Sequence, residues 1–205
     1  MSDLLCFNSV NRSKTRGISM SISDRVYRTC TYIAGDWTGD RDLISKLQQW
    51  NENDHLGLSF VDVHDLTQSS DTSYPCSIKR NLRKRLNVTK TFVLIVGDNT
   101  DKLTKGGCQY CSRYVSSWYG DPYCMSGMSI DSRSFIDYEC EMALKDYKDG
   151  LLKNIVVIYN GKFSPVRDKC PESLRYVGKH LGSVYRGFDG KLYWNYQEIK
   201  NAICQ

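Results

Sequence analysis

The run Thr91-Phe-Val-Leu-Ile-Val-Gly97 holds five consecutive apolar residues between its two ends. A second run of the same kind, Asn154-Ile-Val-Val-Ile-Tyr159, follows later in the chain. A strand with one face in water alternates apolar and polar residues, whereas a strand covered on both faces is apolar throughout. The two runs therefore predict strands in the interior of a parallel sheet, as in α/β proteins.

Further strands are predicted on either side of these runs, over residues 28–34, 58–63 and 183–188, from β-branched and aromatic residues bounded by turn signals. Apolar residues at helical spacing predict a helix after Asp40 and others over 78–90 and 134–150. Two shorter helices are predicted over 171–180 and 194–203. Strands that alternate with helices in this way predict a doubly wound α/β sheet of five parallel strands.

The composition is that of a soluble globular protein, with 205 residues, 40% apolar and 25% charged residues and a net charge of +5. The length predicts one domain over residues 27–205, preceded by a polar N-terminal extension over 1–26. No apolar run approaches the ~18 residues of a membrane span, and the first residues lack the pattern of a signal peptide. We therefore expect a cytoplasmic protein. The charge is too mild for a nucleic-acid binder, and the basic run over 79–85 is expected to be a solvated helix face, with attraction of a nucleotide or a partner as the lesser alternative.

Ligands of such sheets bind at the carboxyl ends of the strands, so the loops there are candidate binding segments. The loop over 35–40 follows the first predicted strand, and its glycines allow backbone amides to approach a ligand. A turn followed by a helix cap is the more ordinary explanation of this loop. His64 and Asp65 follow the second strand, where His64 is expected to form hydrogen bonds within the loop, either structurally or near a substrate.

Nine cysteines are many for a protein of a reducing cytoplasm, where thiols serve as core residues, metal ligands or reactive groups. Residues 98–133 form a cysteine-rich insert with a Cys-x-x-Cys pair at Cys108 and Cys111. With Cys124 and Cys140, this pair predicts a structural zinc site. The alternatives are cysteines buried as small apolar side chains and, less well matched to the pattern, a redox pair.

Glu139 is the residue of the next helix that most suggests chemistry. Helical spacing is expected to turn Phe135, Tyr138 and Met142 inward, which puts Glu139 at the boundary of the buried face and Glu141 toward solvent. A carboxylate among aromatic side chains in a cleft is a candidate catalytic group. The alternative is an acidic residue that offsets the dipole at the beginning of the helix.

The motifs occur in a characteristic order: the loop 35–37, then segments 49–54, 60–65, 77–86 and 92–100, and finally Ser134-Phe-Ile-Asp-Tyr-Glu139. Over residues 27–160, this order resembles the TIR-like domain family of bacterial proteins, which includes the TIR subunits of Thoeris anti-phage defence. The resemblance implies a flavodoxin-like doubly wound sheet of five parallel strands, with the cysteine-rich insert placed before the third main helix.

The resemblance also implies an activity, because family members cleave the nicotinamide–ribose bond of NAD+ and form linear, cyclic or otherwise modified ADP-ribose. Their catalytic residue is a glutamate preceded by a bulky aromatic residue, which corresponds to Glu139 after Tyr138. The reaction needs no cofactor, so a zinc ion would be structural. The substrate-binding residues implied are Gly35, Asp36, Trp37, His64, Asp65, Ser69, Ser134 and Tyr138.

The partners implied are NAD+ and a separate effector that responds to the nucleotide product, with self-association as a further possibility and with neither nucleic acid nor membrane. The chain departs from generic TIR domains because Phe135 and Tyr138 stand where a Trp-Cys pair precedes the glutamate. One alternative is a non-catalytic TIR-like interaction module. A weaker one is a flavodoxin-like response domain with Asp98 as its phosphoacceptor.

Overall fold

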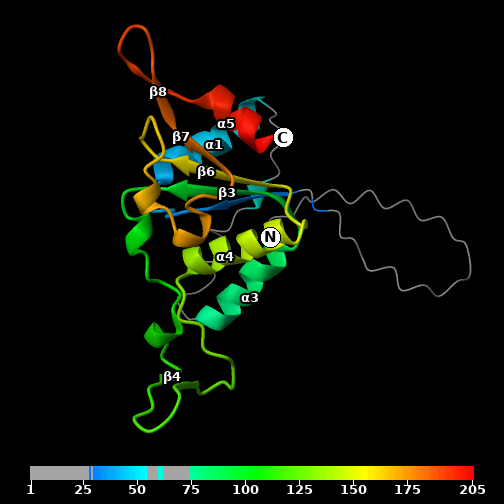
Figure 1. The fold of residues 1–205 in the computed structure, drawn as a ribbon, viewed down its shortest axis with the longest axis vertical. Helices are drawn as coiled ribbons and strands as arrows, with labels where there is room; N and C mark the ends of the chain where they lie inside the picture. The colour runs from blue at the N-terminus through cyan, green and yellow to red at the C-terminus, as the bar shows by residue number, and fades with distance from the viewer. Residues whose placement is uncertain (1–27, 29, 55–59, 62–73) are drawn as a thin grey trace, which may run out of the picture.

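The computed structural model describes residues 28, 30–54, 60–61 and 74–205. Their centre is a five-stranded sheet in the order β2-β1-β3-β6-β7, in which every pair of neighbours is parallel (Figure 1). The strands are β1 (Cys30–Ala34), β2 (Phe60–Val61), β3 (Thr89–Val96), β6 (Asn154–Tyr159) and β7 (Lys179–Gly182). The chain therefore has the α/β fold with a central parallel sheet that its apolar runs predict.

The strand β3 shows why the interior strands are apolar throughout. Phe92, Leu94 and Val96 belong to the core on one face of the sheet. Val93 and Ile95 belong to a second core on the opposite face. Because successive side chains of a strand point to opposite faces, a strand between two cores needs an apolar residue at every position.

Helices cover both faces of the sheet. In Figure 1, α1 (Arg41–Asp54) and α5 (Tyr196–Ile203) lie on one side, and α3 (Pro75–Leu86) and α4 (Phe135–Lys148) on the other. Near the end of α1, the ring of Trp50 contacts Trp194 and Tyr196 edge-on, with centroids 6.4 and 5.0 Å away. None of the helices in the described part of the chain has the length and apolar character needed to cross a membrane.

The basic run of α3 is not the fully solvated face that the sequence predicts. Lys79 is only 4% exposed, and its Nζ donates hydrogen bonds to the carbonyl oxygens of Asp131 and Arg133 at 3.1 and 2.7 Å. Arg83 forms an ion pair with Asp146, a buried residue of α4, at 2.9 Å. Two of the basic side chains thus attach α3 to neighbouring segments.

The fifth strand lies earlier in the chain than predicted. Residues 179–182 form β7, whereas β8 (Val184–Arg186) pairs with β9 (Leu192–Trp194) in a separate antiparallel hairpin. The helix predicted over 171–180 is only a short turn over Glu172–Leu174. Gly178 explains this difference, because it has a φ of +84° and a Cβ atom there would lie 2.4 Å from the carbonyl oxygen of Ile155. The chain at Gly178 is therefore pressed against β6, a position that suits the beginning of a strand and not a helix.

Residues 98–133 contain little regular structure. They form two short turns, over Thr100–Lys102 and Cys108–Tyr110, and a small antiparallel pair, β4 (Tyr114–Val115) with β5 (Tyr123–Cys124). Figure 1 shows the part around β4 extending away from the sheet on the side of α3 and α4. The segment returns to the fold at Ser134, where α4 begins.

Candidate functional site

The beginning of α4 is fixed by Ser134, which is buried. Its Oγ accepts a hydrogen bond from the backbone N–H of Asp137 at 3.1 Å and donates one to the Asp137 carboxylate at 2.6 Å. These bonds satisfy one of the free N–H groups at the helix N-terminus. Ser134, predicted to bind substrate, therefore serves in this structure as the helix cap.

The buried face of α4 differs from the predicted one. Its buried members are Ile136, Glu139, Cys140, Ala143 and Asp146. Phe135, Tyr138 and Met142, which were expected to point inward, are only partly buried against the same core. The aromatic ring of Tyr138 lies beneath two cations instead, with Arg133 at 5.0 Å and Lys79 at 5.6 Å from its centroid.

Glu139 is consequently part of the core and not at its boundary, with 4% of its surface exposed. Its Oε1 accepts a hydrogen bond from the hydroxyl of Tyr32, a fully buried residue of β1. The Tyr32 ring stacks on Phe92 at 5.6 Å, which holds the hydroxyl in place. The full burial of Glu139 was not predicted because a carboxylate is normally excluded from a core. Its hydrogen-bond partner, Tyr32, is also distant in the chain.

Burial raises the pKa of Glu139 to about 7, against the opposing effect of the hydrogen bond from Tyr32. Burial, followed by the charge of Glu139, raises the pKa of Tyr32 well above its ordinary value. Glu139 can therefore exchange between its neutral and ionised forms near neutral pH, as acid–base and charge-stabilising catalytic groups do.

Glu141 is in a different environment on the solvent side of α4. It is exposed, and its Oε2 accepts a hydrogen bond from Arg133 at 2.6 Å. Arg133 also binds both carboxylate oxygens of Asp131, at 2.9 and 2.7 Å. Glu141 thus belongs to a surface ion-pair network, in agreement with its predicted orientation.

A polar cavity of about 160 Å³ lies at the carboxyl ends of β1, β3 and β6. Its wall is made of Asp36, Gly39, Asp40, Gly97, Asp98, Asn99 and Asn160. Asp40 is 1% exposed, and its Oδ2 has no hydrogen-bond partner within the described part of the chain. Its Oδ1 accepts a bond from Asn160 at 3.1 Å. Burial raises the pKa of Asp40, against the effect of that bond. The cavity therefore offers unused acceptors.

The structure brings only part of the predicted site to this cavity. Asp36 lines it, whereas Trp37 packs against the core beneath α1 and α5. A Cβ atom on Gly35 would lie 3.1 Å from that of Ile95, so this glycine permits close packing of the chain. Glu139 is not among the lining residues and contacts the core on the α3 and α4 face. His64, Asp65 and Ser69 lie outside the described residues.

Several residues of the cavity were not among the predicted site residues, including Asp40, Asn99 and Asn160. Each lies in the segment that follows a strand of the parallel sheet. A search for polar residues directly after every predicted strand, and not only the first two, would have found Asn99 and Asn160.

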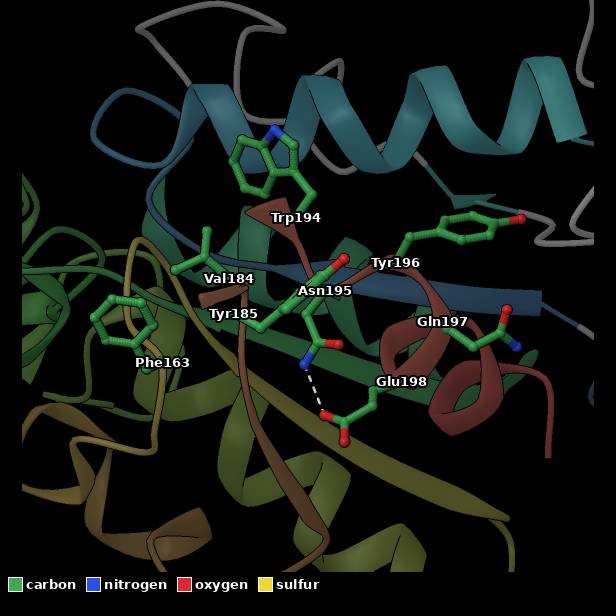
Figure 2. A pocket seen from close by; sticks show the side chains of 8 residues that line it. All are labelled: Phe163, Val184, Tyr185, Trp194, Asn195, Tyr196, Gln197 and Glu198. Carbon is green, nitrogen blue, oxygen red and sulfur yellow. Dashed lines mark hydrogen bonds between the residues drawn. The ribbon is translucent and has the colours of Figure 1, made fainter. Parts of the chain in front are cut away.

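A larger open pocket of about 610 Å³ lies between the β8–β9 hairpin and α5 (Figure 2). Its lining residues are Phe163, Val184, Tyr185, Trp194, Asn195, Tyr196, Gln197 and Glu198. The side-chain amide of Asn195 donates a hydrogen bond to the carboxylate of Glu198 at 2.6 Å, so these two polar side chains of the pocket already bind each other. None of the predicted site residues that the structure describes lines this pocket, and its size alone does not make it the functional site.

The predicted zinc ligands fall into two places. Cys108, Cys111 and Cys124 line one small cavity together with Cys76. Cys140 is fully buried in the core beside Ile136 and Ala143, and is not part of that cavity. Among the described residues, no group of three or more His, Cys, Asp and Glu side chains has the spacing of a formed metal site.

The pKa of Glu139 predicts how stability depends on pH. A folded-state pKa of about 7 against an ordinary 4.5 means that the folded protein holds this proton more tightly. The contribution to stability is therefore complete below about pH 4.5 and is lost as the pH rises through about 7. The free energy of unfolding of Glu139→Gln, taken relative to that of the wild type, is therefore expected to increase by about 3 kcal/mol as the pH rises from about 4 to about 8. Urea unfolding at a series of pH values measures this difference, and parallel curves for the two proteins would show that Glu139 is not held in a low-dielectric core.

Residues 30–105 match the family model described as Thoeris protein ThsB, TIR-like domain. No curated protein matches the chain. The matched segment extends from β1 to the residues after β3, and it ends before α4 and Glu139. It includes the loop after β1 and most of the cavity at the carboxyl ends of the strands. The match supports the resemblance that the sequence motifs indicate, over residues 30–105, where the chain is similar to the TIR-like domain of Thoeris ThsB.

Proposed function

We propose that the chain is an NAD+-consuming TIR-like protein of Thoeris-type anti-phage defence and that Glu139 is its catalytic carboxylate. Its product would be a cyclic or otherwise modified ADP-ribose that acts on a separate effector. The observation that supports this proposal is the buried Glu139 on α4, bound by Tyr32 and with a pKa near neutrality. The match to the TIR-like family supports the choice of substrate.

The proposed reaction needs one negative charge in a weakly solvated site. The bond between C1′ of the ribose and the nicotinamide nitrogen breaks, its electron pair stays with nicotinamide, and positive charge develops on the ribose. Ionised Glu139 stabilises that charge, which is a stronger effect in a core than in water. Water or a nitrogen of the same nucleotide then attacks C1′, and a proton leaves to solvent.

The polar cavity supports a second part of the proposal. Asp36, Asp40 and Asp98 make it rich in acceptors and unfavourable for a pyrophosphate. It suits hydroxyl and amide donors, such as those of a ribose or of nicotinamide. We assign it to bind such donors of the nucleotide.

The burial of Glu139 has a consequence for regulation. With 4% of the residue exposed, contact with a ribose requires the surroundings of α4 to move when the substrate binds. The proposal therefore includes a low basal rate and activation by a trigger that opens the site. The same burial is what favours the second candidate function, a non-catalytic TIR-like module that assembles with other TIR domains.

The full chain incubated with NAD+, with and without lysate of phage-infected cells, separates the two functions. The enzyme is expected to release nicotinamide in an amount equal to the NAD+ lost, together with ADP-ribose or a cyclised isomer, measured by mass spectrometry. Absence of nicotinamide above a lysate-only control under both conditions would overturn the enzymatic proposal in favour of the interaction module.

Tyr32→Phe is expected to shift the pH dependence of NAD+ cleavage. The hydrogen bond from Tyr32 lowers the pKa of Glu139, so its removal raises that pKa further. Because the reaction uses the ionised carboxylate, the rise of kcat/KM with pH moves to higher pH in the variant. Rate measurements across the pH range check this, and an equal loss of activity at every pH would show that Tyr32 has only a structural role.

A further inference from the structure

Four cysteines from three separate segments of the chain converge on one small cavity. Cys76 belongs to the first turn of α3, Cys108 and Cys111 flank a short turn, and Cys124 ends β5. The remaining lining residues are Pro75, Tyr114 and Ser129. The cavity measures about 10 Å³, which is close to the space of one water-sized sphere. Its size and its four sulfur atoms suit a single ion.

Hydrogen-bond donors point at the sulfur atoms on the side of the insert. The backbone N–H of Asp131 donates to Cys108 Sγ at 3.3 Å, and that of Arg113 donates to Cys111 Sγ at 3.5 Å. The hydroxyl of Ser126 lies 3.0 Å from Cys124 Sγ. Donors of this kind stabilise thiolates and orient them, as the groups around bound metals do in proteins. An ordinary buried cysteine in an apolar core does not need them.

The insert also has no apolar core of its own among its described residues from 109 to 133. Of the described residues from 109 to 133, none is buried, and Trp118 and Tyr119 are 90% and 97% exposed. The pairing of β4 with β5 involves two residues on each side. A segment without an apolar core usually depends on a disulfide or a metal. In the reducing compartment expected for this chain, the metal is the more consistent choice.

We propose that Cys76, Cys108, Cys111 and Cys124 bind one divalent metal ion of the zinc class, which fastens the insert to the beginning of α3. Cys76 thus replaces Cys140 of the ligand set that the sequence indicates. The thiols must turn onto a common ion, with sulfur–metal distances of about 2.3 Å, and each releases its proton to solvent as it binds. The guanidinium of Arg113, which stacks on Tyr74 at 4.1 Å, provides positive charge beside the thiolates. The proposal is independent of any activity toward NAD+.

Elemental analysis of the full chain, purified under reducing conditions from cells supplied with zinc, tests the stoichiometry. One zinc per chain is expected in the wild type and less than about a tenth of that in Cys76→Ser, since a four-thiolate site loses most of its affinity with one ligand. Cys140→Ala is the matched control and is expected to keep one zinc per chain. Metal-free wild type, or retention of zinc by Cys76→Ser with loss in Cys140→Ala, would overturn the assignment.

A measurement on the wild type avoids variants that fail to fold. Co²⁺ exchanged for zinc is expected to give the visible and charge-transfer absorption of a tetrahedral four-thiolate site. Alkylation followed by mass spectrometry is expected to leave Cys76, Cys108, Cys111 and Cys124 protected until a chelator is added. Rapid alkylation of any of these four in the metal-loaded protein, or disulfides among them, would contradict the proposal.

Discussion

Glu139→Gln is expected to lower the rate of NAD+ cleavage by about 100-fold or more, the loss typical when a group that stabilises transition-state charge is removed. Glutamine has the shape of glutamate and can still accept the hydrogen bond from Tyr32, but it cannot carry the negative charge that the developing ribose cation needs. The quantity to measure is nicotinamide release by the full chain under the condition that activates the wild type.

Glu141→Gln is the matched control, two positions away on the same helix. Glu141 is exposed and bound to Arg133, so its loss changes a surface ion pair, which contributes little to stability. This variant is expected to retain wild-type activity within about twofold. An inactive Glu141→Gln beside an active Glu139→Gln would move the catalytic role to Glu141, and full activity of both variants would exclude both glutamates of α4 from the reaction.

The two effects of pH expected for Glu139 have opposite signs. Ionisation through about pH 7 supplies the catalytic charge and, at the same time, leaves that charge in a core where it weakens folding. Glu139→Gln should therefore be less active but more stable than the wild type in alkaline solution. A residue selected only for packing would not carry this cost, which is why stability and activity measured on one variant distinguish a catalytic role from a structural one.

The centre of the fold could be predicted from the sequence because its signals are local. The apolar residues of β3 and β6 alone indicate strands between two layers of helices. The edge strand β7 was placed wrongly because its position depends on the contact of Gly178 with Ile155, two residues that are distant in the sequence. Spacing along the chain contains no information about such contacts.

The candidate site was predictable in residue type but not in arrangement. Glu139 was found from its motif, yet its burial depends on a hydroxyl from Tyr32 on another element. The same applies to the cysteines, since Cys76 precedes the first residue of the insert by 22 positions and meets the insert only in the folded chain. Asp40 was not predicted as a site residue within the loop over 35–40, because the cavity that it lines is closed by loops after three different strands.

Asp146→Asn is expected to reduce the free energy of unfolding by about 3–5 kcal/mol, the usual cost of breaking a buried ion pair from one side. The Asp146 side chain is 2% exposed and binds two cations, Arg28 at 2.7 Å and Arg83 at 2.9 Å. Asparagine keeps one acceptor but removes the charge, so two guanidinium groups are left in a poorly solvated place. Urea unfolding at neutral pH measures the loss, and Asp149→Asn, at the exposed residue directly after α4, is a control expected to change stability by less than about 0.5 kcal/mol.

The size of this loss follows from what Asp146 connects. Arg28 precedes β1 and Arg83 belongs to α3, so one carboxylate joins two segments to α4. If water reached the cluster, the charges would be screened and the loss would be below about 1 kcal/mol, as for surface pairs. Replacing Arg83 and Asp146 together by leucine should cost less than Asp146→Asn alone, because the double variant leaves one guanidinium group without the carboxylate and the single variant leaves two. Asp146 shares the buried face of α4 with Glu139, and the same measurements therefore test how firmly the helix that carries the proposed catalytic residue is held.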